Sequence, residues 1–465
     1  MHLMRDGARW IFVVALFCAP WAYGGTTAAS ITMINWLLLA TLVLWIVELL
    51  INCRKPGFPR ALLFLVFVLL AIGGWMVLNA SSIGDSEFNA FAPLEKISPH
   101  LTGSIDYAIS VAWMIRAALL LGVILFVGDL SQDDHWFLRL WVAIGIVAGS
   151  LAFLGLLQKA TGAEMIFWQP ALEPEFNTFF ATYYYHANAG AFLNLVWPLT
   201  AGLAVRAFIT PSNTGVRSLW VTIFVLTLAS VFANTSRMAQ LIAVLLFIPL
   251  AFQLGPRVVR RLSHVEKNIA LAGAGAIFLA LVAVGQASHL EQPITRWQSL
   301  SENISTDARW RAAAAAVRAF PEVGLFGFGP GTFRVVFPFY NKVSSAPAAG
   351  FWRFLHEDYL QTALEWGWLG GALWAALFFG GMVVAVRHYR SPDVRSWFPR
   401  RRLLLPLVVI ALAGVALHAL VDFPLQIASI QLYVATYLGL CWGSGAGGER
   451  RSAYGPAGGQ ITNNK

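Results

Sequence analysis

The chain has 465 residues, of which 58% are hydrophobic and only 12% are charged. This composition excludes a soluble globular protein and indicates a polytopic membrane protein. The formal net charge of +9 is also found in nucleic-acid binders, but basic residues gather on the cytoplasmic loops of membrane proteins, so we expect no nucleic-acid partner. Cys18, Cys53 and Cys441 lie in or beside apolar segments, which predicts neither a disulfide framework nor a thiolate metal site.

Apolar runs long enough to cross a bilayer as a helix recur along the chain. The first run follows a basic start and resembles a signal peptide, but because many further spans follow, we interpret it as an uncleaved first span. Twelve spans are predicted, near residues 10–28, 31–51, 61–79, 106–128, 138–160, 188–208, 218–235, 238–254, 268–286, 359–386, 403–420 and 425–443. The predicted fold class is therefore all-α, an integral membrane protein of about twelve helices.

The spans divide the chain into four regions. Residues 1–286 contain the first nine helices, residues 287–358 form a long polar loop with short helices, and residues 359–443 contain the last three helices. Residues 444–465 are Gly-rich and polar, and we expect this tail to be disordered.

The distribution of basic residues predicts the orientation. Most of the 32 Lys and Arg residues lie on segments that face the cytoplasm if the N-terminus is inside. Most of the others lie in the loop 287–358, and long loops translocate largely regardless of charge. We therefore expect both termini inside, with the long loop outside.

The long loop contains one clear helix signal, in STDARWRAAAAAVRAF. Thr306 suits the N-cap position, and the alanine run has high helix propensity. At helical spacing Arg311 and Arg318 share a face, whereas Arg309 points roughly the opposite way. Two interpretations remain open: an amphipathic helix lying on the bilayer, and a helix that turns Arg309 toward the membrane domain.

Two further arginines lie at or within predicted spans. Arg237, in NTSRMAQ, lies at the outer junction of two spans, where an arginine either snorkels to the interface or belongs to a site. Arg116 lies deeper, and it fits equally well a structural partner for a carboxylate and a functional group.

The outer ends of the last spans contain acid and histidine side chains. His356, Glu357 and Asp358 open a helix whose acidic start suits the helix dipole, so capping explains the two acids better than it explains the histidine. His418 and Asp422 are four residues apart on one face, where the acid either orients the imidazole or makes a structural hydrogen bond.

Other polar groups on the outer side are weaker candidates. His186 and Asn188, in YYYHANAGAF, lie at the outer end of the sixth span and are candidates to line an external cavity. Asp85 and Glu87 form a pair of carboxylates in the first outer loop, a pattern common in polar loops. We predict neither a metal site nor a cofactor.

Five of these motifs follow one another in an order that resembles a known family. HANAGAF is followed by TSRMAQ, by DARW with GFGPGTF, by HEDYLQTALEWGWLGG and by HALVDFPLQ. Their order is similar to that of the O-antigen ligase and Wzy-type O-antigen polymerase superfamily of bacterial membrane glycosyltransferases. The resemblance covers about residues 180–445.

The resemblance implies a GT-C-like membrane glycosyltransferase. Such an enzyme moves a glycan from an undecaprenyl-pyrophosphate carrier to an acceptor hydroxyl at the periplasmic face of the bacterial inner membrane, without metal and with inversion. The family's serine-arginine motif matches Ser236 and Arg237, its loop arginine matches Arg309, and its histidine matches His356. Many members have asparagine where this chain has Glu357, so either His356 or Glu357 is the base.

The sequence alone leaves several functions open. We assign pyrophosphate binding to the two arginines, and we expect supporting or cavity-lining roles for Ser236, Asp422, His418, His186, Asn188 and Arg311. The acceptor is a glycan, a lipid A core or a protein, so ligase, polymerase and protein O-oligosaccharyltransferase are not separated. A transporter or flippase of lipid-linked glycans is the alternative, although no internal repeat supports it.

Overall fold

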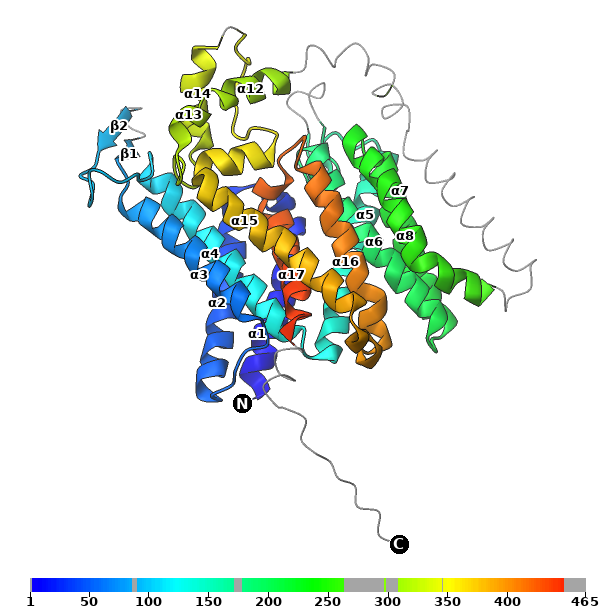
Figure 1. The fold of residues 1–465 in the computed structure, drawn as a ribbon. Coiled ribbons are helices and arrows are strands. Elements are labelled where there is room, and N and C mark those ends of the chain that lie inside the picture. The colour runs from blue at the N-terminus through cyan, green and yellow to red at the C-terminus, as the bar shows by residue number, and fades with distance from the viewer. Residues whose placement is uncertain are drawn as a thin grey trace.

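The computed structural model describes residues 2–85, 90–170, 178–262, 297, 308–344 and 346–446. Within this part the chain forms a bundle of long helices, with shorter elements gathered at one end (Figure 1). The predicted span 268–286, the predicted N-cap Thr306, Glu87 and the tail beyond residue 446 lie outside the described residues.

The long helices follow the predicted spans closely. They are α1 (His2–Trp21), α2 (Ala28–Ile51), α3 (Arg60–Leu78), α4 (Tyr107–Leu130), α5 (Asp134–Ala160), α6 (His186–Ile209), α7 (Thr214–Ala233), α8 (Arg237–Leu262), α15 (Asp358–Arg390), α16 (Pro399–His418) and α17 (Ala428–Gly443). All of these except α1 and α17, nine helices in the described part of the chain, are long and apolar enough to cross a membrane. This confirms the prediction of an all-α polytopic membrane protein.

The helix ends follow from local capping. Asp106 precedes α4 and accepts a hydrogen bond from Ile109 N at 3.0 Å. Asp133 precedes α5 and Asn213 precedes α7, and both side chains accept from N–H groups of the first turn in the same way. These side chains satisfy donors that no helical carbonyl reaches.

The shorter elements lie at the end of the bundle where α15 begins (Figure 1). An antiparallel hairpin, β1 (Ser82–Asp85) and β2 (Ala90–Pro93), projects beyond α3 and α4. The polar loop before α15 contributes α12 (Ala308–Val317), α13 (Phe320–Val323) and α14 (Phe333–Lys342). We call this end of the molecule the loop end.

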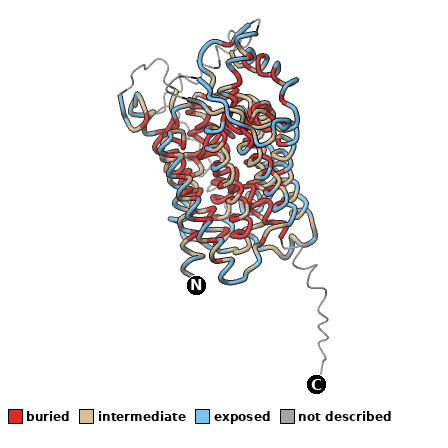
Figure 2. The backbone as a smooth tube through the Cα atoms, turned by 90° about the vertical axis from the view of Figure 1, so that its left-hand side faces the viewer, coloured by how far each residue is buried: buried red, intermediate tan, exposed pale blue. Residues whose placement is uncertain are grey.

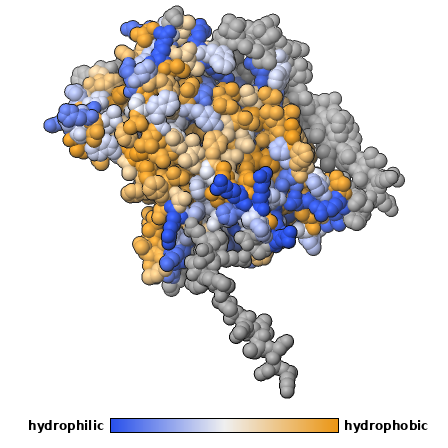
Figure 3. Space-filling model, viewed as in Figure 1, coloured by the Kyte–Doolittle hydropathy of each residue, from blue (hydrophilic) through white to orange (hydrophobic). Residues whose placement is uncertain are grey.

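The core of the bundle surrounds α6, which is buried along almost its whole length. Buried residues lie in the interior of the bundle, and exposed ones lie around it (Figure 2). Trp141, Trp197 and Tyr433 are among the largest fully buried side chains. Outward-facing positions are also apolar, for example Phe67 and Phe252, which are 68% and 80% exposed. Hydrophobic residues accordingly dominate the middle of the surface, and hydrophilic ones gather toward its two ends (Figure 3). A surface of this kind faces lipid rather than water.

The opposite end is tied together by ion pairs. Arg54, after α2, pairs with Asp129 of α4 at 2.7 Å and with Glu48 of α2 at 2.8 Å. Trp45 Nε1 also donates to Asp129, at 3.0 Å. Both carboxylates also accept hydrogen bonds from other groups, which buried charges require.

Candidate active site

The long helix α15 is broken one-third of the way along, and the break receives the polar loop. Gly367 has φ +69°, so the helical hydrogen bonds stop there. The carbonyls of Leu364 and Glu365 accept instead from Phe328 N and Gly329 N, each at 2.9 Å. The loop therefore supplies the hydrogen bonds that the broken helix lacks.

The loop crosses α15 at the break, and two glycines make this crossing possible. A Cβ atom at Gly367 would lie 2.3 Å from the carbonyl oxygen of Leu325, and one at Gly327 would lie 2.4 Å from Gly367 N. Both contacts are to backbone atoms, so no side chain can move aside. The GFGPGTF and EWGWLGG segments are therefore two halves of one crossing.

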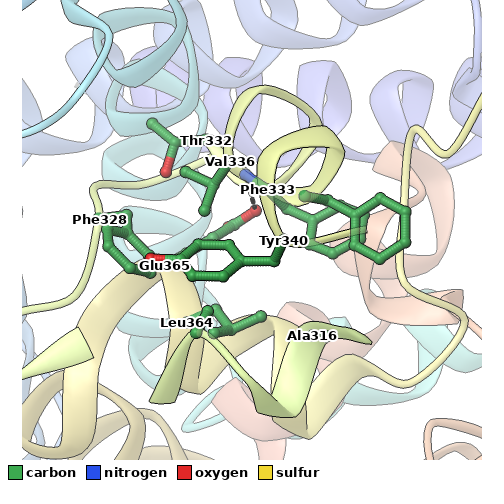
Figure 4. A pocket seen from close by; sticks show the side chains of 10 residues that line it. Ala316, Phe328, Thr332, Phe333, Val336, Tyr340, Leu364 and Glu365 are labelled. Carbon is green, nitrogen blue, oxygen red and sulfur yellow. Dashed lines mark hydrogen bonds between the residues drawn. The ribbon is translucent and has the colours of Figure 1, made fainter. Parts of the chain in front are cut away.

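A buried carboxylate fastens the loop to α15. Glu365 is 4% exposed and accepts hydrogen bonds from Gly331 N at 3.0 Å, from Phe333 N at 3.3 Å and from Gln361 Nε2 at 3.0 Å. Figure 4 shows its carboxylate directed at the start of α14, beside a cavity of only about 10 Å³ lined by Tyr340 and its neighbours. The loop helices thus rest on α15 as a tightly packed unit.

The alanine run of α12 sets the direction of Arg309. Ala312, Ala315 and Ala316 are buried in a small apolar cluster with Phe333 of α14. This packing holds α12 close to α14 and α15, because alanine permits close approach without losing side-chain entropy. Arg309, on a different face, points to the membrane helices.

Just before α15, His356 meets an acid from the segment that follows α16. His356 Nδ1 lies 3.0 Å from Asp422 Oδ1. Asp422 follows α16. Its side chain is 3% exposed, whereas that of His356 is 22% exposed. Phe423 N donates to the same Oδ1 at 3.0 Å, so the carboxylate is fixed before it reaches the ring.

Tyr185 connects this pair to the loop arginine. Its hydroxyl donates to Asp422 Oδ2 at 3.3 Å and accepts from Arg309 Nη2 at 2.7 Å. Arg309, Tyr185, Asp422 and His356 therefore form one chain of hydrogen bonds. We call these four residues the His356 group.

Aromatic rings enclose the His356 group. The imidazole of His356 makes edge contacts with Phe423 at 4.5 Å, Trp352 at 5.4 Å and Tyr185 at 6.0 Å between ring centroids. Tyr185 also stacks on Phe423, at 5.7 Å and 3° between planes. Such walls fix the orientation of the imidazole and are suited to stacking against sugar rings.

The backbone at His356 is strained. Its φ is +62°, in the left-handed region that non-glycine residues rarely adopt. A residue held there costs on the order of 1–3 kcal/mol, and such residues cluster at functional sites. The two residues that follow His356 are both held by hydrogen bonds.

Glu357 and Asp358 serve the start of α15. Glu357 accepts from Tyr359 N and from Leu360 N, as an N-cap does. Asp358 is fully buried and accepts from Leu425 N and from Gln426 Nε2, each at 2.8 Å. Glu357 is thus a helix cap, as the sequence suggests, whereas the carboxylate of Asp358 binds the segment before α17 instead.

The serine-arginine turn lies beside the start of α6. Asn234 Nδ2 donates to His186 O at 2.8 Å, and Asn234 Oδ1 accepts from Ser236 N at 3.0 Å. Ser236 is buried and caps α8 through Ala239 N, at 3.3 Å. Arg237 is half-buried and begins α8, so it too lies at the loop end.

The remaining predicted site residues differ in burial and in how close they lie to the His356 group. His418 and Asn188 are both buried, and neither ring nitrogen of His418 has a hydrogen-bond partner among the described residues. The ring of His186 lies 4.8 Å from that of Tyr185, next to the His356 group. Arg311 is exposed on α12 and points away from this group, as the helical spacing predicts.

The charge state of Asp422 follows from its neighbours. Burial alone raises the pKa of this carboxyl, but the hydrogen bond and charge of His356, with the charges of Arg309 and His418, hold it below its ordinary value. Asp422 is therefore an acceptor only. Nδ1 of His356 must then carry the proton, which leaves Nε2 as the ring's acceptor.

Comparison with known proteins identifies the domain. Residues 222–375 match the family model described as O-antigen ligase. This segment, called the O-antigen ligase domain below, is similar to that family. This confirms the resemblance that the ordered motifs predicted, and it supports a ligase- or polymerase-like function in polysaccharide biosynthesis. No curated protein matches the chain.

The O-antigen ligase domain contains only part of the His356 group. Arg309 and His356 lie within residues 222–375, whereas Tyr185 and Asp422 lie before and after them. Tyr185 was not singled out from the sequence, because it is one of three consecutive tyrosines and nothing in YYYHANAGAF selects it. Its position next to His186 is the only available signal.

Proposed function

We propose that this protein is a glycosyltransferase that moves a glycan from undecaprenyl pyrophosphate to an acceptor hydroxyl at the periplasmic face of the inner membrane. The O-antigen ligase domain supports the class of function. The observation that carries the proposal is the hydrogen-bonded chain of Arg309, Tyr185, Asp422 and His356. It holds a cationic group and a proton acceptor side by side at one end of the bundle.

In the proposed reaction His356 acts as the general base. Asp422 holds Nδ1 protonated, so Nε2 accepts the proton of the acceptor hydroxyl. The acceptor oxygen attacks the anomeric carbon as the bond from that carbon to the phosphate oxygen breaks. The electron pair leaves with the pyrophosphate, and a single displacement inverts the anomeric centre.

Arg309 is the proposed site of charge stabilisation for the leaving group. The developing negative charge on the pyrophosphate needs fixed positive charge near the reacting atoms. Arg309 lies two hydrogen bonds from Asp422, and Arg237 begins α8 at the same end of the bundle. Both arginines are expected to contact the pyrophosphate.

The test is transfer by the purified protein from a lipid-linked glycan to an acceptor, followed by mass spectrometry. We expect His356→Ala to lower the rate by roughly 100- to 10,000-fold, because a general base is lost. Arg309→Gln should lower it by about 100- to 1,000-fold. Arg311→Gln is the matched control: it removes an exposed arginine from the same helix and should change the rate by less than about 2-fold.

The hydroxyl of Tyr185 offers a finer test. Tyr185→Phe keeps the ring that stacks on Phe423 but removes the link between Arg309 and Asp422. We expect a loss of roughly 5- to 20-fold, as one hydrogen bond near a charge provides. Full activity of His356→Ala would refute His356 as the base. Movement of the lipid-linked glycan across the membrane without a new glycosidic bond would refute the enzyme and favour the transporter.

A further inference from the structure

A second feature of the molecule is a cavity that lies along α15. A cavity of about 500 Å³ extends between α4, α15 and α17. Both α4 and α15 pack on α3 and on α17, but they hardly touch one another. The cavity occupies the space between them.

The cavity is long and mostly apolar. Along α15 its lining runs from Asp358 to Phe379, a length on the order of 30 Å at the helical rise. Small residues spaced by four, Ala363, Gly367, Gly371 and Ala375, leave a groove on this face of α15. The other walls carry rings and aliphatic side chains: Trp113, Leu120, Trp366, Trp374, Phe378 and Leu438. This shape suits one extended hydrocarbon chain.

One cation lines this apolar cavity. Arg116, in the third turn of α4, is 8% exposed. Among the described residues no hydrogen bond or ion pair holds its guanidinium, and its contact is with the ring of Trp113, at 5.2 Å. Burying an arginine without a carboxylate partner costs free energy, and in a membrane protein such a residue indicates a ligand.

The carboxylates that line the cavity are hydrogen-bonded to groups other than Arg116. Asp358 and Glu365 both line the cavity, but Asp358 accepts from Leu425 N and Gln426, and Glu365 accepts from the N–H groups that fasten the loop. Arg116 therefore lines the cavity without a counter-ion among the described residues, and a bound anion would supply one.

We propose that this cavity binds a long-chain lipid phosphate, with the phosphate at Arg116 and the chain along α15. Along α15 the lining begins at Asp358, two residues after His356, but it includes no member of the His356 group. We further assign the bound lipid as the anchor of the acceptor, an assignment that rests on the proposed function, whereas the binding itself does not.

The binding test uses geranylgeranyl phosphate with a photoreactive group at the end of its chain. We expect labelling of the α15 peptide that contains residues 363–379, and a roughly 10- to 100-fold weaker affinity in Arg116→Met, because a charged hydrogen bond is lost. Arg116→Lys should retain most of the labelling. Ala375→Trp, which fills the groove and leaves the arginine in place, should abolish it.

Three controls decide the nature of the site. The uncharged alcohol geranylgeraniol should bind wild type and Arg116→Met alike, and inorganic phosphate should not compete. Unchanged labelling in Arg116→Met would overturn the proposal, and full competition by inorganic phosphate would show a site for a free anion. Loss of labelling in Arg309→Gln would mean that the cavity belongs to the donor site already described.

Transfer kinetics in the same preparation test the acceptor assignment. Arg116→Met should raise KM for a lipid-anchored acceptor about tenfold or more and leave KM for the donor unchanged. A rise in the donor KM alone would overturn the assignment. His356→Ala, assayed alongside, reports on the proposed reaction independently, because it removes the base without touching the cavity.

Discussion

His356 depends on residues from three other segments of the chain. Asp422 orients its ring, Tyr185 holds Asp422, and Arg309 adds positive charge to the same chain of hydrogen bonds. The left-handed backbone at His356 turns the side chain out of the line of α15. The imidazole therefore has one orientation, which a general base requires because proton transfer demands a fixed distance.

Glu357 is the rival for the role of base, and a single substitution separates the two. Glu357→Gln keeps one oxygen for capping α15, so we expect a loss of about 0.5–2 kcal/mol in stability. If His356 is the base, the transfer rate should stay within about 3-fold of wild type. A loss as large as that of His356→Ala would make Glu357 the base.

The same variant has a predicted effect on the pH dependence of stability. Burial raises the pKa of Glu357, although hydrogen bonds from Leu360 and Tyr359 oppose the rise. A carboxyl whose folded pKa lies above its unfolded pKa stabilises less as pH rises through that interval. We therefore expect thermal unfolding of Glu357→Gln to depend less on pH in the weakly acidic range than that of wild type. An unchanged slope would contradict the shift.

At the scale of elements, the break in α15 joins the loop to the membrane bundle. The loop segment from residue 324 to 329 supplies hydrogen bonds on both sides of Gly367. Because α12 rests on this crossing, the position of Arg309 depends on it although the arginine lies well away from the break. We expect any change that opens the crossing to affect catalysis.

Gly367→Ala tests this dependence, with Gly324→Ala as its control. Both glycines have the same kind of backbone, φ +69° and +60° with extended ψ, so both variants carry strain of about 1–3 kcal/mol. Only at Gly367 does the new Cβ meet backbone atoms, at 2.3 Å. Gly367→Ala should therefore lower both the unfolding temperature and the transfer rate well beyond Gly324→Ala. Equal effects would show that the crossing can relax.

At the scale of the whole molecule, the two ends of the bundle differ in chemistry. The His356 group and the loop helices lie at one end, and the Arg54, Glu48 and Asp129 cluster lies at the other. The charge distribution predicts that the cluster end faces the cytoplasm.

Cys53 provides a native probe of this orientation. It is exposed at the cluster end, whereas Cys441 is buried. A membrane-impermeant thiol reagent should label Cys53 in inverted vesicles and not in intact spheroplasts, and Cys53→Ser should remove the signal. Labelling in spheroplasts would reverse the orientation and put the loop end in the cytoplasm.

The sequence predicted the features that depend on residues close to one another in the chain. Apolar run length predicted the positions of α2 to α8, α15 and α16, and helical spacing predicted that Arg309 and Arg311 point apart. What it did not predict depends on contacts between distant segments. Tyr185 meets Asp422 across 237 positions. That Arg116 has no acidic partner in the described part of the chain is visible only once Asp358 and Glu365 are seen to bind other groups.

The contacts of α17 bear on the order in which the proposed site is assembled during synthesis. Tyr433 of α17 donates to Leu16 O at 3.0 Å, and Ser429 Oγ donates to Gly24 O at 2.6 Å, so α17 docks on the end of α1. Asp422 lies in the segment between α16 and α17, after residues 222–375. In the proposed reaction the base, His356, is therefore synthesised before the acid that orients it. A chain truncated before Asp422 should accordingly lack transfer activity even though it contains His356.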